Sequence, residues 1–109
     1  RKAIDLAETV YALTSRFPAD ERFGLTSQMR RCAVSIPSNI AEGHGRETRA
    51  AYVNHLRIAR GSLREFETQA IIAGRVHLAA ADEIALVLVA CDEQGRMLHA
   101  LMTKLEAAP

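Results

Sequence analysis

The sequence predicts an all-α protein: an antiparallel up-and-down four-helix bundle, formed as a single domain by residues 1–109. Apolar residues recur at steps of three and four along four segments, which is the pattern of amphipathic helices. No stretch alternates apolar and polar residues with the period that is typical of strands. The connections between the segments are short, which places successive helices antiparallel, and the chain length suits one hydrophobic core.

The first predicted helix carries an apolar stripe that ends at a proline. The members of the stripe are Ala3, Leu6, Val10, Leu13 and Phe17. We expect the helix to end at Phe17, because Pro18 disfavours helical geometry in the residue before it. The residues that follow, 18–21, are typical of a turn or of the start of a short helix.

The second predicted helix has the same spacing but contains a proline. Its apolar residues are Leu25, Met29, Cys32, Ile36 and Ile40. The ring of Pro37 clashes with the carbonyl four residues earlier, and its nitrogen has no hydrogen to donate. We therefore expect the helix to be kinked near Ala33 or to restart at Pro37. Gly43 and Gly45 suit a helix end that needs positive φ angles.

The third and fourth predicted helices have the longest apolar stripes. Thr48 can cap the third helix by accepting from free backbone N–H groups, Gly74 ends it, and Asp82 can cap the fourth. The third stripe consists of Tyr52, Leu56, Ala59, Leu63, Phe66, Ala70 and Ala73, and the fourth of Ile84, Leu88, Cys91, Gly95, Leu98, Met102 and Leu105. Such alternating steps are typical of helices that pack in bundles.

The fourth helix has more apolar residues than one bundle can bury. Every residue from 84 to 91 is apolar, so the helix presents apolar side chains on faces that a monomer leaves in water. Three isoleucines also lie off the stripe of the third helix: Ile58, Ile71 and Ile72. We expect a homo-oligomer, with Val87 or Val89 at its subunit contacts. The apolar run is much shorter than the ~20 residues that cross a bilayer, so we expect no membrane span.

The two cysteines favour a reducing compartment. Cys32 and Cys91 are far apart in the sequence, form no C-x-x-C pair and lie on apolar helix faces. Buried, reduced thiols are the common state of such cysteines, and a disulfide or a reactive thiol is the alternative. We expect a cytoplasmic protein, because the sequence shows no apolar export segment. The start at Arg1 suggests that a few N-terminal residues are missing.

Arginine is concentrated in the middle of the chain. Residues 25–64 hold seven Arg and two Glu, whereas residues 65–109 hold three basic and seven acidic residues. A segment with mostly positive charges can indicate a nucleic-acid partner. The alternative is that the segment faces an acidic segment across the fold or across a subunit contact of the oligomer. The candidates for contact with RNA or DNA are Arg30, Arg31, Arg46, Arg49, Arg57, Arg60 and Arg64.

Three of these arginines, Arg57, Arg60 and Arg64, share one arc of the third helix and could meet phosphates. The alternative is a solvated face with local pairs such as Arg64 with Glu67. Aromatic residues do not interleave with this arc, so base stacking is not predicted there.

Small polar residues form a ridge on the second helix, next to its apolar stripe. Each member of the ridge lies three or four residues from another member. The members are Arg31, Ser35, Ser38, Asn39 and Glu42. The ridge is either a recognition surface or a structural network, in which Ser and Asn satisfy carbonyls freed by Pro37 and Arg46 pairs with Glu42. We favour the structural interpretation, because a kinked helix needs such partners.

The sequence shows no catalytic motif. It contains no P-loop, no dinucleotide-binding glycine pattern and no nucleophile elbow. The four histidines, His44, His55, His77 and His99, lack the Glu-x-x-His spacing of metal sites in helical bundles. We therefore expect no catalytic residues, no metal site, no cofactor and no enzymatic activity. Binding of a small ligand by residues 35–46 is the weakest of the interpretations that we consider.

A long run of residues in the first three predicted helices forms a specific pattern: Phe17-Pro18, Glu21, Phe23 to Arg31, Ser35 to Gly43, Gly45-Arg46, Ile58 to Leu63 and Glu65. In these residues the chain resembles the four-helix-bundle proteins encoded in intervening sequences of bacterial 23S ribosomal RNA genes, and the resemblance weakens in the fourth helix. It implies a four-helix bundle, usually a homopentamer, with no established enzymatic activity. The chain is also similar to the accessory proteins of diversity-generating retroelements, basic pentamers that associate with nucleic acid and a reverse transcriptase.

From these observations we expect a non-enzymatic, cytoplasmic, bacterial protein that forms a homo-oligomer, most simply a homopentamer. Its expected partner is RNA or DNA, bound through an Arg-rich face. The alternative is a protein-binding or structural adaptor with no nucleic-acid role, whose partner could be a reverse transcriptase or another protein.

Overall fold

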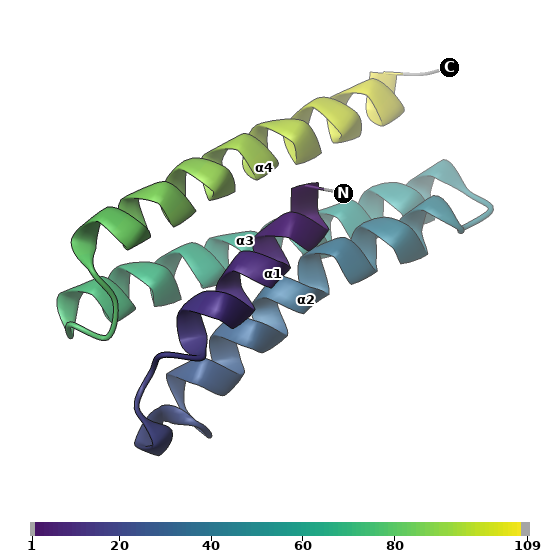
Figure 1. Cartoon of the computed structure of the whole chain (residues 1–109). Coiled ribbons are helices and arrows are strands. Elements are labelled where there is room, and N and C mark those ends of the chain that lie inside the picture. Colours follow the sequence, from purple (N-terminus) through teal and green to yellow (C-terminus); the bar gives the residue numbers. More distant parts are fainter. Residues whose placement is uncertain (1, 108–109) are drawn as a thin grey trace.

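The computed structural model describes residues 2–107, and within them the protein is all α-helical (Figure 1). The main elements are α1 (Lys2–Thr14), α2 (Leu25–His44), α3 (Arg49–Arg75) and α4 (Ala81–Ala107), with the short 3-10 helix η1 (Ala19–Glu21) before α2. The described range contains no strand. The molecule measures 50 × 23 × 19 Å. The prediction of a four-helix bundle is confirmed.

The helices form an antiparallel bundle in which α2 and α3 are the most closely associated pair. Helix α4 lies along α3, and α1 packs against α2 and α4 (Figure 1). Helix α1 has 13 residues and α4 has 27, lengths of about 20 and 40 Å at the rise of an α-helix. Lys2 at the start of α1 pairs with Glu93 near the middle of α4. The short helix therefore accompanies only part of the long one.

The core is built by the stripes that the sequence predicts. Every stripe residue of α3 is buried except Tyr52, which is half-buried against the core. In α4, Leu88 and Leu105 are half-buried and the other stripe residues are buried. Phe66, Met29, Ile36, Leu56 and Leu63 are among the largest fully buried side chains, and each contributes roughly 1.5–3 kcal/mol of hydrophobic stabilisation.

Both cysteines are free and buried, as predicted. Burial raises the pKa of the Cys91 thiol to about 12. Burial, followed by the carboxylate of Glu65, also raises the pKa of Cys32. These thiols therefore stay protonated near neutral pH and are poor nucleophiles. Within residues 2–107, no helix is long and apolar enough to cross a membrane.

Helices α1 and α2 each differ from the prediction in one respect. Helix α1 ends at Thr14 rather than Phe17, although Phe17 is still buried in the core. Helix α2 runs continuously through Pro37, so the predicted restart there is wrong.

The prediction of positive φ angles at Gly43 and Gly45 is also wrong. Gly45 has φ −84°, and no glycine in the described range has a positive φ. Gly43 lies inside α2, and a Cβ at this position would come within 2.8 Å of the Cβ of His55 and 3.0 Å of the Tyr52 ring. Glycine is therefore required because α2 and α3 approach closely, not because the helix ends there.

The end of α3 is formed by a histidine in the left-handed conformation. The helix extends to Arg75, one residue beyond the predicted Gly74, and His77 has φ 64°. The N–H of Leu78 donates to the carbonyl of Ala73 over 2.9 Å, and that of His77 donates to Gly74 over 3.2 Å. These two bonds define a Schellman motif, in which glycine usually occupies the position of His77.

The N-termini of α3 and α4 are capped in different ways. Thr48 has an extended backbone, and its side chain accepts from the N–H of Ala51 over 3.1 Å, so the predicted cap is confirmed. Asp82 lies in the first turn of α4 rather than at the N-cap position, and its carboxylate accepts from the N–H of Glu83 over 2.9 Å. The carboxylate of Glu83 accepts from the N–H of Ala80 over 3.2 Å, which is the return half of a capping box.

Apolar side chains remain on the surface of α4. Leu86 and Val89 are 73% and 68% exposed, whereas Val87 is 4% exposed and belongs to the core. The prediction of Val87 as a subunit contact is therefore wrong, because this side chain points into its own bundle. Ile58, Ile71 and Ile72 of α3 are exposed, in agreement with their place off the stripe.

Candidate nucleic-acid interface

Three of the candidate arginines are paired with carboxylates of the same chain. Arg57 of α3 bonds Glu106 of α4 over 2.9 Å. Arg46 bonds Glu42 over 2.7 Å, as predicted, and Arg64 bonds Glu67 over 3.0 Å. These pairs are largely exposed, so each contributes at most about 1 kcal/mol to stability. A phosphate that approached these arginines would have to compete with a carboxylate.

The other two candidate arginines of α3 line separate surface hollows. Arg49 lies in the first turn of α3 beside the Arg57–Glu106 pair. Arg60 is half-buried and lines a groove between α3 and α4 with Arg64, Arg96 and His99. Asp92 also lines this groove and is bonded to Arg96. The candidate arginines of α3 therefore face mixed charges rather than one positive surface.

Arg30 of α2 is held by neutral groups of α1. Its Nε donates to Oγ1 of Thr14 over 2.8 Å, and its Nη2 donates to the carbonyl of Tyr11 over 3.5 Å. Its guanidinium lies over the Tyr11 ring, 4.5 Å from the ring centre. Since none of these partners carries a negative charge, Arg30 joins α1 to α2 while its own charge stays uncompensated.

Two further arginines lie near Arg30 and also make their direct contacts with neutral groups. Arg31 donates from Nη2 to Oγ of Ser27 over 3.2 Å. The guanidinium of Arg22, in the turn before α2, lies 5.3 Å from the centre of the Phe23 ring. Among residues 2–107, no carboxylate lies within ion-pair distance of Arg22, Arg30 or Arg31.

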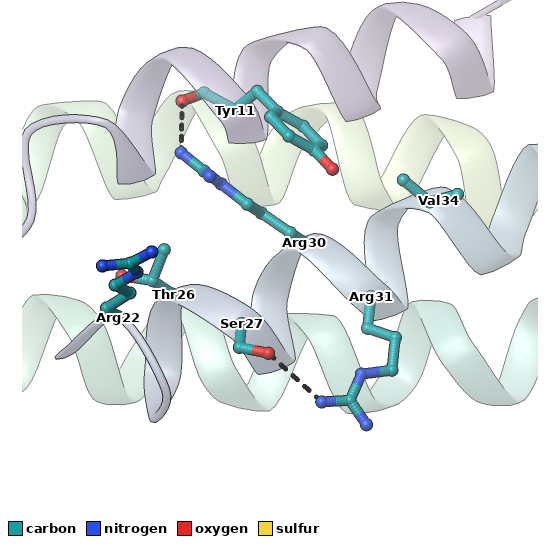
Figure 2. A pocket seen from close by; sticks show the side chains of 7 residues that line it. All are labelled: Tyr11, Arg22, Thr26, Ser27, Arg30, Arg31 and Val34. Atoms are coloured by element: carbon teal, nitrogen blue, oxygen red, sulfur yellow. Dashed lines mark hydrogen bonds between the residues drawn. The ribbon is translucent and has the colours of Figure 1, made fainter.

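These arginines surround an open groove of about 470 Å³ between α1 and α2, which we call the α1–α2 groove (Figure 2). Its lining consists of Tyr11, Arg22, Thr26, Ser27, Arg30, Arg31 and Val34. The lining offers three guanidinium groups, three hydroxyl groups and no carboxylate. Glu21, which precedes Arg22, is occupied at the start of α2, where it accepts from the N–H of Leu25 over 3.2 Å. The groove is therefore suited to an anion.

Two residues of the predicted polar ridge, Ser35 and Asn39, form a hydrogen-bonded chain between α2 and α3. Oγ of Ser35 lies 2.8 Å from Oγ of Ser62, and Nδ2 of Asn39 donates to Oγ of Ser35 over 3.1 Å. Oδ1 of Asn39 lies 3.1 Å from Nδ1 of His55. All four side chains are half-buried. The network therefore connects two helices, as in the structural interpretation, while Ser38 is exposed and Glu42 pairs with Arg46.

One detail of the structural interpretation is wrong. We expected the ridge to satisfy the carbonyl that Pro37 leaves without a donor, which is that of Ala33. The Asn39 side chain instead donates to the carbonyl of Ser35, over 2.9 Å. The ridge therefore stabilises the contact between helices rather than the backbone around Pro37.

Residues 2–107 hold no group of three or more His, Cys, Asp or Glu side chains placed to bind a metal ion. The functional groups that the structure does bring together are the arginine side chains of the α1–α2 groove. The sequence alone predicted only some of the residues around them. Arg30 and Arg31 were among the predicted contacts, but Tyr11, Arg22 and Phe23 were not. Tyr11 lies on a different helix, and Arg22-Phe23 lies in a turn, so no helical spacing connects them with Arg30.

Comparisons with known proteins agree with this fold. The family model described as 23S rRNA-intervening sequence protein matches residues 1–100. A solved structure from Bacteroides thetaiotaomicron VPI-5482, described as a protein with unknown function from the S23 ribosomal protein family, superposes with a TM-score of 0.83. The alignment has 21% sequence identity and covers 93% of this chain and 94% of the other, so it supports the fold alone. Among curated proteins, none matches the sequence.

Proposed function

The chain belongs to the 23S rRNA-intervening sequence protein family, and we propose that it is a non-enzymatic, homo-oligomeric helical bundle that binds RNA or DNA through arginine side chains. The observation that supports nucleic-acid binding is the α1–α2 groove, where Arg22, Arg30 and Arg31 are held by neutral groups alone. We further propose that the protein acts in the bacterial cytoplasm and assembles as a pentamer, as its resemblance to the family implies.

The neutral partners matter because they hold the guanidinium groups without cancelling their charge. Arg30 and Arg31 use only part of their N–H groups on Thr14, Tyr11 and Ser27, so donors remain for a phosphate. Planar guanidinium groups can bind phosphate oxygens through paired hydrogen bonds. A phosphate entering the α1–α2 groove displaces water, whereas a phosphate at Arg57 or Arg64 must displace Glu106 or Glu67. We therefore place the main contact at the groove and a secondary one along α3.

A pair of matched variants tests this assignment. Arg22→Gln/Arg31→Gln removes charge from the α1–α2 groove, and Arg57→Gln/Arg64→Gln removes the same charge from α3. Affinity for RNA or DNA should fall with salt, because each neutralised phosphate releases counterions. The groove variant should lower the slope of log K against log salt by roughly 1.4–1.8, from ~0.7–0.9 for each of the two lost contacts. The α3 variant should change it less.

Fluorescence anisotropy across a salt series measures these slopes, and thermal melting of each variant controls for folding. An equal or larger effect of the α3 variant would move the interface to α3. A wild-type protein that binds neither RNA nor DNA near physiological salt would contradict nucleic-acid binding altogether.

One observation favours a protein-binding adaptor as the second candidate. A mostly apolar hollow of about 350 Å³ lies between α1 and α4, next to the exposed Leu86. Its lining includes Ala12, Leu13, Val87 and Ala90. Such a surface suits a protein partner or another subunit. The resemblance to retroelement accessory proteins makes a reverse transcriptase one candidate partner, which co-purification of the two proteins would test.

A further inference from the structure

A largely exposed aromatic ring lies beside the α1–α2 groove. Phe23 is 87% exposed, the highest value among the large hydrophobic side chains of the described residues. It occupies the turn between η1 and α2, immediately after Arg22, which lines the groove. A phenylalanine in water has no hydrogen-bonding group that would explain its position. The residues around Phe23 therefore indicate which kind of partner could pack on its ring.

The surroundings of Phe23 are cationic. The guanidinium of Arg22 lies over the ring at 5.3 Å, and Arg30 and Arg31 follow along the same groove. On the other helix of the groove, Tyr11 is 46% exposed, and the guanidinium of Arg30 lies over its ring. Tyr11, three arginines, Thr26 and Ser27 thus line one opening (Figure 2), and Phe23 lies at its edge, next to Arg22 in the chain.

From this arrangement we infer that the α1–α2 groove binds single-stranded nucleic acid, with an unpaired base stacked on Phe23 and the neighbouring phosphates bound by Arg22, Arg30 and Arg31. The inference rests on the proposed nucleic-acid function and names its substrate class. A positively charged groove combined with aromatic stacking surfaces is the arrangement by which proteins hold single strands without sequence preference.

The position of Phe23 distinguishes a single strand from a duplex. In a duplex the base faces are covered by their neighbours in the stack, so a protein must read the backbone or the groove edges. An exposed ring gains nothing from a stacked duplex, but it can stack on a base of a single strand. The arginines alone would bind the phosphates of either form, so Phe23 is the residue that creates the preference.

Substitution of Phe23 tests the inference, because its ring contributes little to the core. We would label a single strand of ~15 nucleotides, close to the upper end of known site sizes, as RNA and as DNA, and compare each with a duplex of the same sequence. Phe23→Ala should weaken single-strand binding roughly 5- to 150-fold, from ~1–3 kcal/mol per stacked base. Phe23→Trp should preserve it, and duplex affinity should not change in either variant.

The control variant is Ile58→Ala, which removes an exposed apolar side chain of α3 outside the groove lining and should leave all affinities unchanged. Light scattering must show the same oligomer for every variant. If Phe23→Ala dissociates the oligomer, the ring is a subunit contact and the inference is wrong. If the wild type binds both forms equally and Phe23→Ala changes neither, stacking is refuted while nucleic-acid binding stands. If the wild type binds no nucleic acid, both proposals fail.

Discussion

At the scale of single residues, two helical glycines have opposite surroundings. Gly43 of α2 faces His55 and Tyr52, and an added Cβ would lie 2.8 Å from the Cβ of His55. Gly61 lies in the middle of α3, where an added Cβ would meet no atom within 4 Å. The first glycine is required by helix packing, whereas the second only adds flexibility to the unfolded chain.

Alanine substitutions should therefore have opposite effects at the two positions. We expect Gly61→Ala to raise the free energy of unfolding by roughly 0.5–1 kcal/mol, because alanine loses less backbone freedom in a helix. Gly43→Ala should lower it, because α2 would have to move away from α3. Urea denaturation measures both changes, and a Gly43→Ala variant as stable as the wild type would show that this helix contact can relax.

The left-handed conformation of His77 gives a second prediction at this scale. With φ 64°, His77 carries a Cβ where the Schellman motif favours glycine. His77→Gly should raise the free energy of unfolding by about 1 kcal/mol, because the clash of Cβ with the following carbonyl disappears. His77→Ala is the control, since it removes the imidazole but keeps Cβ, and should bring no gain. A loss of stability in His77→Gly would mean that the imidazole itself stabilises this turn.

At the scale of helices, the polar chain through Ser35, Asn39, His55 and Ser62 joins α2 to α3. Asn39→Ala removes bonds to Ser35 and His55, and should lower the free energy of unfolding by about 1–3 kcal/mol. Ser38→Ala, at an exposed position of the same helix, should stay within about 0.5 kcal/mol of the wild type. Thermal melting measures both. If Asn39→Ala keeps its stability but loses nucleic-acid binding, the ridge is a recognition surface.

The same scale shows what the sequence could predict. The apolar stripe of α3 was correct because helical periodicity is a local property, and nearly all of its members are buried. Helix ends were less accurate, since His77 takes the place of a glycine, and the carboxylate of Glu83 rather than that of Asp82 accepts from the N–H of Ala80 at the start of α4. The α1–α2 groove was predicted only in part. It depends on Tyr11 of α1 meeting Arg30 of α2, which is a tertiary contact that no spacing within one helix reveals.

At the scale of the whole molecule, α1 and α4 expose apolar side chains that a monomer cannot bury. Ile4 and Tyr11 of α1 and Leu86, Val89 and Met97 of α4 are exposed. Leu86 and Val89 lie in the part of α4 that α1 accompanies, between the Arg16–Glu83 and Lys2–Glu93 pairs, and they are still exposed, so another subunit could cover them. A closed ring of subunits would also repeat the α1–α2 groove and strengthen binding to a long nucleic acid through multivalency.

We therefore expect light scattering to give an oligomer mass for the wild type at micromolar concentration, most simply that of a pentamer. Leu86→Asp/Val89→Asp should dissociate it into folded monomers, because both side chains are exposed within one subunit and a charge is costly in an apolar interface. Val87→Asp should instead unfold the chain, because Val87 is buried in its own core. Circular dichroism separates the two outcomes, since helicity survives dissociation but not unfolding. A monomeric wild type would contradict the assembly, and the repeated groove with it, and would leave Leu86 and Val89 as a surface for a different protein.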